Sequence, residues 1–316
     1  PALITGAFAD RIGFRTYLLF LVLWSLLVYV PFVHWIWGHG WLAQMGVVDF
    51  AGGLVVHLSA GMAALASVFV VGSRKPGPEG SRLPHNLPFV ALGTGLLWFG
   101  WFGFNGGSAL AANGVAAIAF VNTNTAASAA MVTWMLIGWW HTGKPSMSGA
   151  MAGAVAGLAT ITPAAGFVPT WSALIIGFAA GAVCYGACQF RAAREWDDAL
   201  DVWAVHGVGG ALGVVLTGVF ATVAINGVKG VIDGGARELG VQIVGVAVVG
   251  AYSFIATVVI LRLIGLFMDV RVPAEDELGH LDGVLHGETA YQPFWSQMDG
   301  HSQAAPVAAE GNEIRS

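Results

Sequence analysis

The chain has 316 residues, of which 56% are hydrophobic and only 10% are charged, with a formal net charge of -5. A typical soluble domain is about 25% charged, so this composition excludes most soluble folds. It also lacks the basic clusters that bind nucleic acid. The 45 glycines suit helices that pack closely in lipid. The composition therefore predicts an all-α polytopic membrane protein.

Membrane-crossing helices need about 20 mostly apolar residues. Eight segments meet this requirement and are predicted to be spans: 16–37, 49–72, 87–110, 115–140, 147–165, 171–190, 201–222 and 239–268. The fourth is interrupted by the polar run 122–125, whose side chains we expect to bond to neighbouring helices. Together the spans predict one transmembrane domain over 1–268.

Lys and Arg in short loops mark the cytoplasmic side of a membrane protein. One alternate set of loops holds nine of these residues, whereas the other holds only Lys229 and Arg237. The first set is predicted to be cytoplasmic, in a multi-pass protein of the cell membrane with its C-terminus inside. Residues 269–316 carry nine acids and two bases. They are expected to form a cytoplasmic regulatory tail, disordered after about 292.

Small residues recur at helical spacing in three predicted spans. The GxxxG patterns are Gly149, Gly153 and Gly157, then Gly177 and Gly181, then Gly209 and Gly213. They predict a tight bundle. Cys184 and Cys188 lie four residues apart in an apolar run without further ligands nearby, which favours packing over metal binding.

Two histidines lie deep inside predicted spans, where ionisable residues are costly and usually functional. His57 follows Asp49 by eight residues, about 12 Å along a helix. His206 follows Asp201 in a similar segment of opposite direction, which indicates an inverted repeat with its site near the midplane. Two neutral imidazoles can form a donor–acceptor chain that holds a polar solute or relays a proton. Packing alone is the alternative for the histidines, and helix capping is the alternative for the two acids.

Aromatic residues gather at the predicted outer face. Trp37 ends one span, and Trp101, Phe104 and Ser108 end another, at i, i+3 and i+7 on one helix face. Rings beside a hydroxyl would attract a small cation, although an interfacial aromatic belt is the alternative. Enzyme motifs fail: the near-P-loop at 138–145 has Pro145 where Ser or Thr is required. We expect no enzyme, no metal and no cofactor.

At these residues the sequence resembles the ammonium transporter (Amt) branch of the Amt/Rh family. The resemblance is colinear from about residue 3 to 291. It rests on DFAGGLVVH at 49–57, PHNLPFVALGTGLLWFGWFGFNGGS at 84–108, AFVNTNTAA at 119–127, GKPS at 143–146, DVWAVHGVGG at 201–210 and HGETAY at 286–291. It implies a homotrimer of pores in the lipid bilayer, each an inverted repeat of five plus five helices with an eleventh. Only eight of the eleven family helices are complete in this sequence, and residues 1–14 resemble the inner end of the third family helix. We therefore expect the sequence to be truncated at its N-terminus.

The resemblance also implies roles for the candidate residues in transmembrane ammonium transport for nitrogen uptake. Trp37, Phe104 and Ser108 would recruit ammonium as a cation, with Trp101 lining the adjacent wall. His57 and His206 would line the pore through which ammonia passes after deprotonation. Asp49 would support the recruitment site, and the role of Asp201 stays open.

Other functions remain open at this point. The same pore residues would serve an ammonium sensor that reports through the tail. An Rh-type neutral ammonia channel is a second alternative, against which Trp37 argues, and a membrane-embedded metalloenzyme is a third. The resemblance further implies a PII-type regulatory protein as a partner at the acidic segment 269–291 and the inner loops.

Overall fold

The computed structural model describes residues 1–75, 84, 86–278 and 281–288. In these residues the chain is helical, and its one β-bridge joins Ile12 to Arg271. The elements, with η for 3-10 and π-helices, are η1 Ala2–Ala7, α1 Phe14–Trp24, η2 Ser25–Tyr29, α2 Val30–Ile36, α3 Trp41–Met45, η3 Gly53–Leu58, α4 Ser59–Val71, α5 Leu87–Gly107, α6 Gly114–Thr142, α7 Met147–Ile161, α8 Thr170–Ala193, η4 Trp203–Val208, α9 Gly209–Phe220, α10 Val223–Asn226, η5 Val231–Asp233, α11 Ala236–Ile264, α12 Ala274–Leu278 and η6 Asp282–His286.

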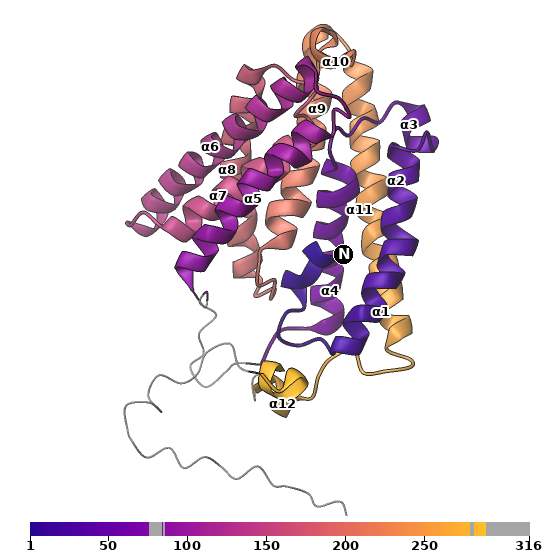
Figure 1. Cartoon of the computed structure of the whole chain (residues 1–316), viewed down its shortest axis with the longest axis vertical. Helices are drawn as coiled ribbons and strands as arrows, with labels where there is room; N and C mark the ends of the chain where they lie inside the picture. The colour runs from indigo at the N-terminus through magenta and orange to yellow at the C-terminus, as the bar shows by residue number, and fades with distance from the viewer. Residues whose placement is uncertain (76–83, 85, 279–280, 289–316) are drawn as a thin grey trace, which may run out of the picture.

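The long helices run side by side along the longest axis of the molecule (Figure 1). Helices α5 to α8 form one side of the bundle, and α1, α2 and α11 form the other. Helices α4 and α9 lie between them and join the two sides. The short helices α3 and α10 lie at one end, opposite α12.

Seven helical stretches in the described part of the chain are long and apolar enough to cross a membrane: Phe14–Met45, Gly53–Val71, Leu87–Gly107, Gly114–Thr142, Thr170–Ala193, Trp203–Phe220 and Ala236–Ile264. They correspond to seven of the eight predicted spans. The predicted span 147–165 differs, because α7 has only 15 residues and ends at Ile161. Turns follow from Thr162, the residue before Pro163, where helices usually end.

The polar run in α6 makes the expected contacts with neighbouring elements. The side-chain amide of Asn122 donates to the carbonyls of Ala165 and Val168, at 2.9 and 2.7 Å. Thr123 accepts a hydrogen bond from Asn105 of α5 at 2.9 Å. The interruption in the predicted span therefore binds α6 to the rest of the bundle.

The predicted GxxxG patterns lie at close helix contacts. A Cβ atom on Gly177 of α8 would lie 2.5 Å from the carbonyl oxygen of Ala126 in α6, and one on Gly157 of α7 would meet the same oxygen at 2.5 Å. A Cβ on Gly213 of α9 would collide with the carbonyl oxygen of Thr160. Only glycine fits these crossings, so the sequence sets how closely the helices approach.

Substitution of Gly177 by Ala is expected to destabilise the bundle by about 1–3 kcal/mol, because the added methyl overpacks the contact between α6 and α8. Thermal unfolding of the purified protein in detergent measures this effect. Gly186 of the same helix is the matched control, since a Cβ there meets nothing within 4 Å. Gly186→Ala should leave stability unchanged or raise it slightly through helix propensity. Equal losses in both variants would contradict the packing argument.

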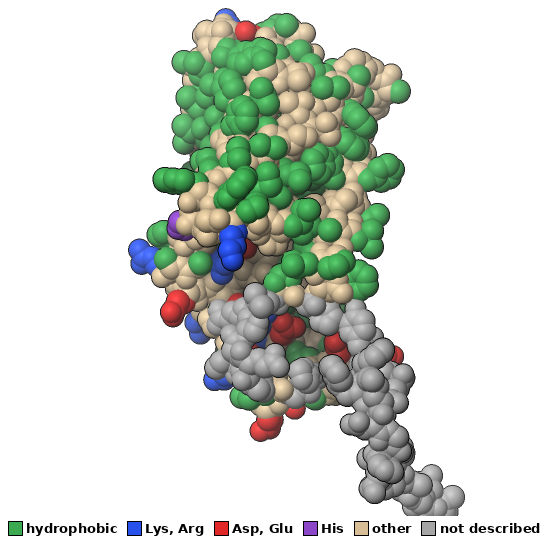
Figure 2. Space-filling view, turned by 90° about the vertical axis from the view of Figure 1, so that its left-hand side faces the viewer, with side chains coloured by type: hydrophobic (Ala, Val, Ile, Leu, Met, Phe, Trp, Pro, Cys, Tyr) green, Lys and Arg blue, Asp and Glu red, His purple; other side chains and the backbone are tan. Residues whose placement is uncertain are grey.

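Charged side chains gather toward the end of the bundle that carries α12, whereas hydrophobic side chains cover most of the visible face beyond it (Figure 2). Arg11 is fully buried at this charged end. Its guanidinium donates to the backbone carbonyls of Ala7, Ala9, Gly72 and Asp197. Burial lowers the pKa of Arg11 to about 10, which leaves it charged at neutral pH. The Asp197 carboxylate, 3.9 Å away, supplies the opposite charge.

Asp197 also pairs with Arg74. The Arg74 guanidinium donates to the two carboxylate oxygens at 2.8 and 3.0 Å, and the Arg74 backbone N–H donates at 2.8 Å. Burial by itself would raise the pKa of the Asp197 carboxyl, but the Arg74 bonds and the Arg11 charge hold it well below its usual range. Arg74 also forms an ion pair with Asp10 at 3.1 Å, and the side chain of Asp10 is 70% exposed.

The first residues of the predicted tail, 269–316, are attached to this charged end. The backbone N–H of Val272 donates to the carbonyl of Arg11 at 3.0 Å. Arg271 pairs with Glu277 of α12 at 2.7 Å. The tail therefore begins against the loop that precedes α1. The segment expected to be disordered, after about 292, lies outside the described residues.

Candidate functional site

Two short π-helices carry the predicted pore histidines. His57 lies in η3, which continues into α4, and His206 lies in η4, which continues into α9. The two helices touch through glycine: a Cβ on Gly61 of α4 would collide with the backbone of Gly207 in η4. A Cβ on Gly210 would lie 3.0 Å from the Cβ of His57. This close backbone approach brings the histidines together.

His57 and His206 form a hydrogen-bonded pair. Their Nδ1 atoms lie 3.2 Å apart, and their rings are stacked with centroids 5.2 Å apart at 27°. Both side chains are buried, with exposures of 2% and 7%. In each imidazole, Nδ1 makes this contact and Nε2 stays available for another partner. The pair can therefore form a continuous chain of hydrogen-bond donors and acceptors.

Aromatic rings cover the His57 end of the pair. Trp101 of α5 stacks on His57 with centroids 5.3 Å apart at 22°, and Phe104 lies 6.0 Å from the same ring. Trp101 and Phe104 also touch each other edge to face at 5.7 Å. Ser108 follows α5 directly, and its hydroxyl donates to the carbonyl of Phe104 at 2.8 Å. Three of the four predicted aromatic-site residues therefore come from one helix end.

Thr162 is a member of this cluster that sequence reasoning missed. Its hydroxyl oxygen accepts a hydrogen bond from the Trp101 indole at 2.9 Å and lies 3.3 Å from Nε2 of His57. Pro163, which follows it, packs against Gly53 at the start of η3. A threonine in an apolar segment is ordinary, so only this tertiary contact identifies it.

Asp49 holds the start of η3 and contacts Trp37. Its carboxylate accepts hydrogen bonds from the backbone N–H groups of Gly52, Gly53, Leu54 and Val55, at 2.7–3.1 Å. Its backbone carbonyl accepts a hydrogen bond from the Trp37 indole at 2.7 Å. The carboxylate thus satisfies helix N–H groups that would otherwise lack partners, and the same residue places Trp37 next to η3.

The acid that plays the equivalent part before η4 is Asp198. Its carboxylate accepts a hydrogen bond from the backbone N–H of Trp203 at 2.8 Å, and it precedes His206 by eight residues, as Asp49 precedes His57. Asp201, which the sequence analysis compared with Asp49, has φ +52° and pairs with Arg191 at 2.6 Å. The equal eight-residue spacing was the signal that would have identified Asp198.

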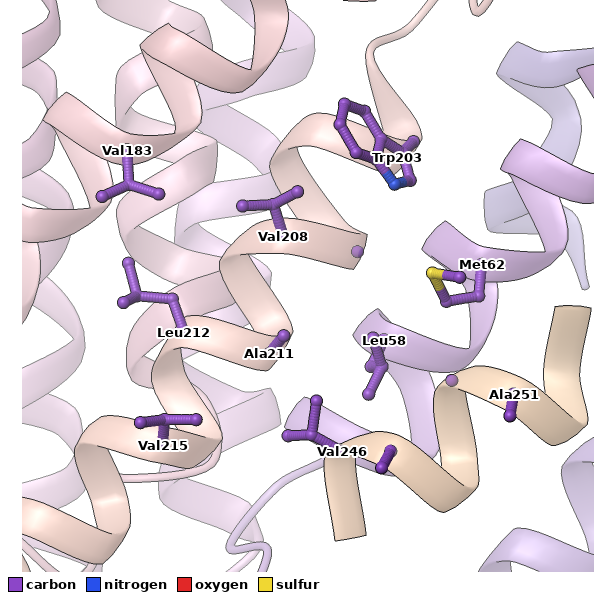
Figure 3. A pocket seen from close by; sticks show the side chains of 13 residues that line it. Leu58, Met62, Val183, Trp203, Val208, Ala211, Leu212, Val215, Val246 and Ala251 are labelled. Carbon is purple, nitrogen blue, oxygen red and sulfur yellow. The ribbon is translucent and has the colours of Figure 1, made fainter. Parts of the chain in front are cut away.

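A cavity of about 550 Å³ lies beside the histidine pair and does not include it. Leu58, Met62 and Val246 lie across it from Val208 and Ala211 (Figure 3). The indole nitrogen of Trp203 is the only side-chain nitrogen or oxygen in its lining. This cavity offers almost nothing to a polar solute, so the candidate site is the histidine pair and its aromatic cover. In the described residues no group of three His, Cys, Asp or Glu could hold a metal ion.

Comparison with known proteins gives this site a context. The family model described as Ammonium Transporter Family matches residues 1–291. The chain belongs to the ammonium transporter family. It is 50% identical over 294 residues to the ammonium transporter of Bacillus subtilis, covering 92% of this chain and 72% of that protein. It is 48% identical over 290 residues to ammonium transporter Amt1 of Archaeoglobus fulgidus, covering 92% and 74%. This family consists of transporters rather than enzymes.

Solved structures agree with the family assignment. The crystal structure of Saccharomyces cerevisiae Mep2 matches with a TM-score of 0.81 and 37% identity, over 87% of this chain and 64% of that one. A structure described as a sensor Amt protein matches with a TM-score of 0.82 and 34% identity, over 89% and 72%. The chain therefore spans roughly two thirds to three quarters of these relatives and has the helical bundle of the family.

Proposed function

We propose that this chain transports ammonium across a membrane, by a path that runs past His57 and His206. The observation that carries the proposal is the 3.2 Å contact between the two Nδ1 atoms, buried between membrane-crossing helices. Buried ionisable side chains in membrane spans are costly and commonly mark ion or proton paths. Family membership supports the substrate.

Recruitment of the cation occurs at the aromatic end of the site. Phe104 is 40% exposed and Trp37 is 39% exposed, so ring faces are available to a small cation from outside the bundle. An aromatic face attracts ammonium through cation–π contact. Ser108 adds a hydroxyl at the end of the same helix as Phe104. Asp49 supports this end by fixing η3 and the indole of Trp37.

Ammonium then loses a proton, so that its nitrogen crosses the membrane as neutral ammonia and not as an ion. A bare charge at the bilayer centre costs several kcal/mol. Ammonium avoids this cost when it gives up its proton, whereas potassium has none to give. Neutral ammonia passes along the imidazoles, and the bonded pair offers a separate route for the proton. Selectivity on this path rests on hydrogen bonding rather than ionic size.

Assembly, orientation and partners belong to the same proposal. The transporter works as a homotrimer in the cell membrane, with the charged end that carries α12 in the cytoplasm. The gathering of Lys and Arg side chains toward this end supports that orientation (Figure 2). The contact between the acidic tail segment and the loop before α1 makes this face a suitable docking surface for a PII-type regulator.

The transport proposal is tested by current across proteoliposomes that contain the protein, after a jump in ammonium and, separately, in potassium. A current with ammonium only is the expected result, because potassium cannot shed a proton. An internal pH change without current would indicate neutral ammonia passage. Absence of both signals would contradict transport.

Sensing is the second candidate function, favoured by the similarity to a sensor Amt protein. A sensor would bind ammonium at the same residues and change the state of its tail without flux. Ammonium binding by protein that shows neither current nor pH change would favour this alternative.

A further inference from the structure

We propose that Thr162 fixes which nitrogen atoms of the His57–His206 pair carry protons, and thereby gives the pair a direction. The significance for transport rests on the proposed function, but the proton arrangement itself can be measured without transport. Thr162 is fully buried immediately after α7. It contacts both Trp101 and His57, so it joins the aromatic cover to the pair.

The hydroxyl of Thr162 can donate only one hydrogen bond. A hydroxyl has one proton and two lone pairs. The proton is used in the 2.7 Å bond to the carbonyl of Leu158. One lone pair accepts from the indole N–H of Trp101, which can only donate. The Thr162 oxygen, which lies 3.3 Å from Nε2 of His57, therefore has only its second lone pair left for that contact. The contact is a hydrogen bond only if Nε2 of His57 carries a proton.

A proton on Nε2 of His57 determines the proton positions on the other three ring nitrogens of the pair. A neutral imidazole has a proton on one nitrogen and a lone pair on the other. With Nε2 of His57 protonated, Nδ1 of His57 is an acceptor, so Nδ1 of His206 must donate across the 3.2 Å contact. Nε2 of His206 is then left with a free lone pair. The pair therefore has a donor end at His57 and a basic end at His206.

The direction has a consequence for selectivity. The donor end lies at the ring that Trp101 and Phe104 cover. Ammonia has a lone pair and can compete with Thr162, at its long 3.3 Å contact, for the N–H of His57, whereas ammonium and potassium cannot accept a hydrogen bond. At the other end, Nε2 of His206 can accept an N–H of ammonia. Thr162 is thus a positioning residue, which acts through His57 and selects the uncharged form at the entrance to the pair.

Three variants separate this role from packing. Thr162→Val removes the hydroxyl and keeps the shape, and Thr162→Ser restores the hydroxyl. Thr160→Val is the matched control, because Thr160 is also fully buried in the same segment but contacts Cys184 of α8 instead of the histidines. In the first proton arrangement Nε2 of His57 is protonated, and in the second Nδ1 of His57 is protonated. Loss of one hydrogen bond changes the ratio of the first arrangement to the second by about tenfold.

Nitrogen NMR of protein labelled with ¹⁵N-histidine distinguishes protonated from unprotonated ring nitrogens, with the signals assigned through His57→Ala and His206→Ala. The expected result is a protonated Nε2 on His57 in the unaltered protein, in Thr162→Ser and in Thr160→Val. In Thr162→Val, the ratio should fall by about tenfold, so that the second arrangement becomes visible. A proton on Nδ1 of His57 in the unaltered protein, or an unchanged ratio in Thr162→Val, would overturn the proposal.

Transport gives the second measurement. The ratio of ammonium to potassium flux should fall in Thr162→Val and recover in Thr162→Ser. Recovery would not follow if Thr162 merely filled space, since Val fills it better than Ser. If the protein carries no flux at all but its NMR signals are as expected, the proposed function fails and the proton arrangement stands.

Discussion

Ammonium-driven current is expected to fall by about a hundredfold when His206 is replaced by Ala. The substitution removes one imidazole of the bonded pair, and with it the 3.2 Å contact that continues the donor–acceptor chain. A proton left at His57 would have to cross the bilayer centre without a relay. Placing a charge there costs about 2.5–3.5 kcal/mol on insertion scales, and each 1.4 kcal/mol is a factor of ten in rate.

Current recorded from reconstituted protein checks this result, with His141→Ala as the control. His141 lies in the last turn of α6 and forms a hydrogen bond with Tyr185 at 2.7 Å, so its loss removes a histidine without touching the pair. Its current should equal that of the unaltered protein. An undiminished ammonium current in His206→Ala would refute the proton relay. Ammonia flux without current in that variant would show that the path for the neutral molecule is separate from the path for the proton.

Replacement of Asp197 by Asn is expected to destabilise the protein by about 3 kcal/mol at neutral pH. The carboxylate stands between the buried Arg11 and the partly buried Arg74. Removal of its charge leaves the Arg11 guanidinium buried without its counter-charge, and breaking a buried pair in this way typically costs about 3–5 kcal/mol. The remaining amide oxygen retains part of the hydrogen bonding, which places the estimate at the lower end.

Unfolding in detergent as a function of pH measures the Asp197 contribution. The folded-state pKa of Asp197 is lowered, so its stabilisation is fully present above the unfolded value near ~4 and is lost as pH falls below it. The Asn variant should lack this pH dependence. Asp10→Asn is the control, because Asp10 pairs with the same Arg74 but is 70% exposed and should contribute at most about 1 kcal/mol. Equal effects of the two substitutions would contradict the role of burial.

The helical bundle was predictable from sequence because hydropathy acts over whole spans. Seven predicted spans correspond to membrane-length helices. The exception, 147–165, shows the limit of hydropathy: Pro163 stops α7 although the residues beyond it are still apolar. Capping at Asp49 could be anticipated because it depends on residues only three to six positions away.

The histidine pair was less fully predictable. Deep burial of His57 and His206 follows from their place within apolar spans, but their contact depends on glycines that bring the η3–α4 and η4–α9 helices together in space. Thr162 was missed because its partners lie 61 and 105 residues away in the chain. Asp198 was missed because Asp201 stands nearer the apolar run, and only the backbone turn at φ +52° shows which carboxylate faces the helix.

The glycine contact between Gly61 of α4 and Gly207 of η4 also sets how closely the two histidine-bearing helices lie. Where backbone touches backbone, any side chain larger than hydrogen would force the helices apart. The spacing of the histidine pair therefore depends on two residues that have no side chain.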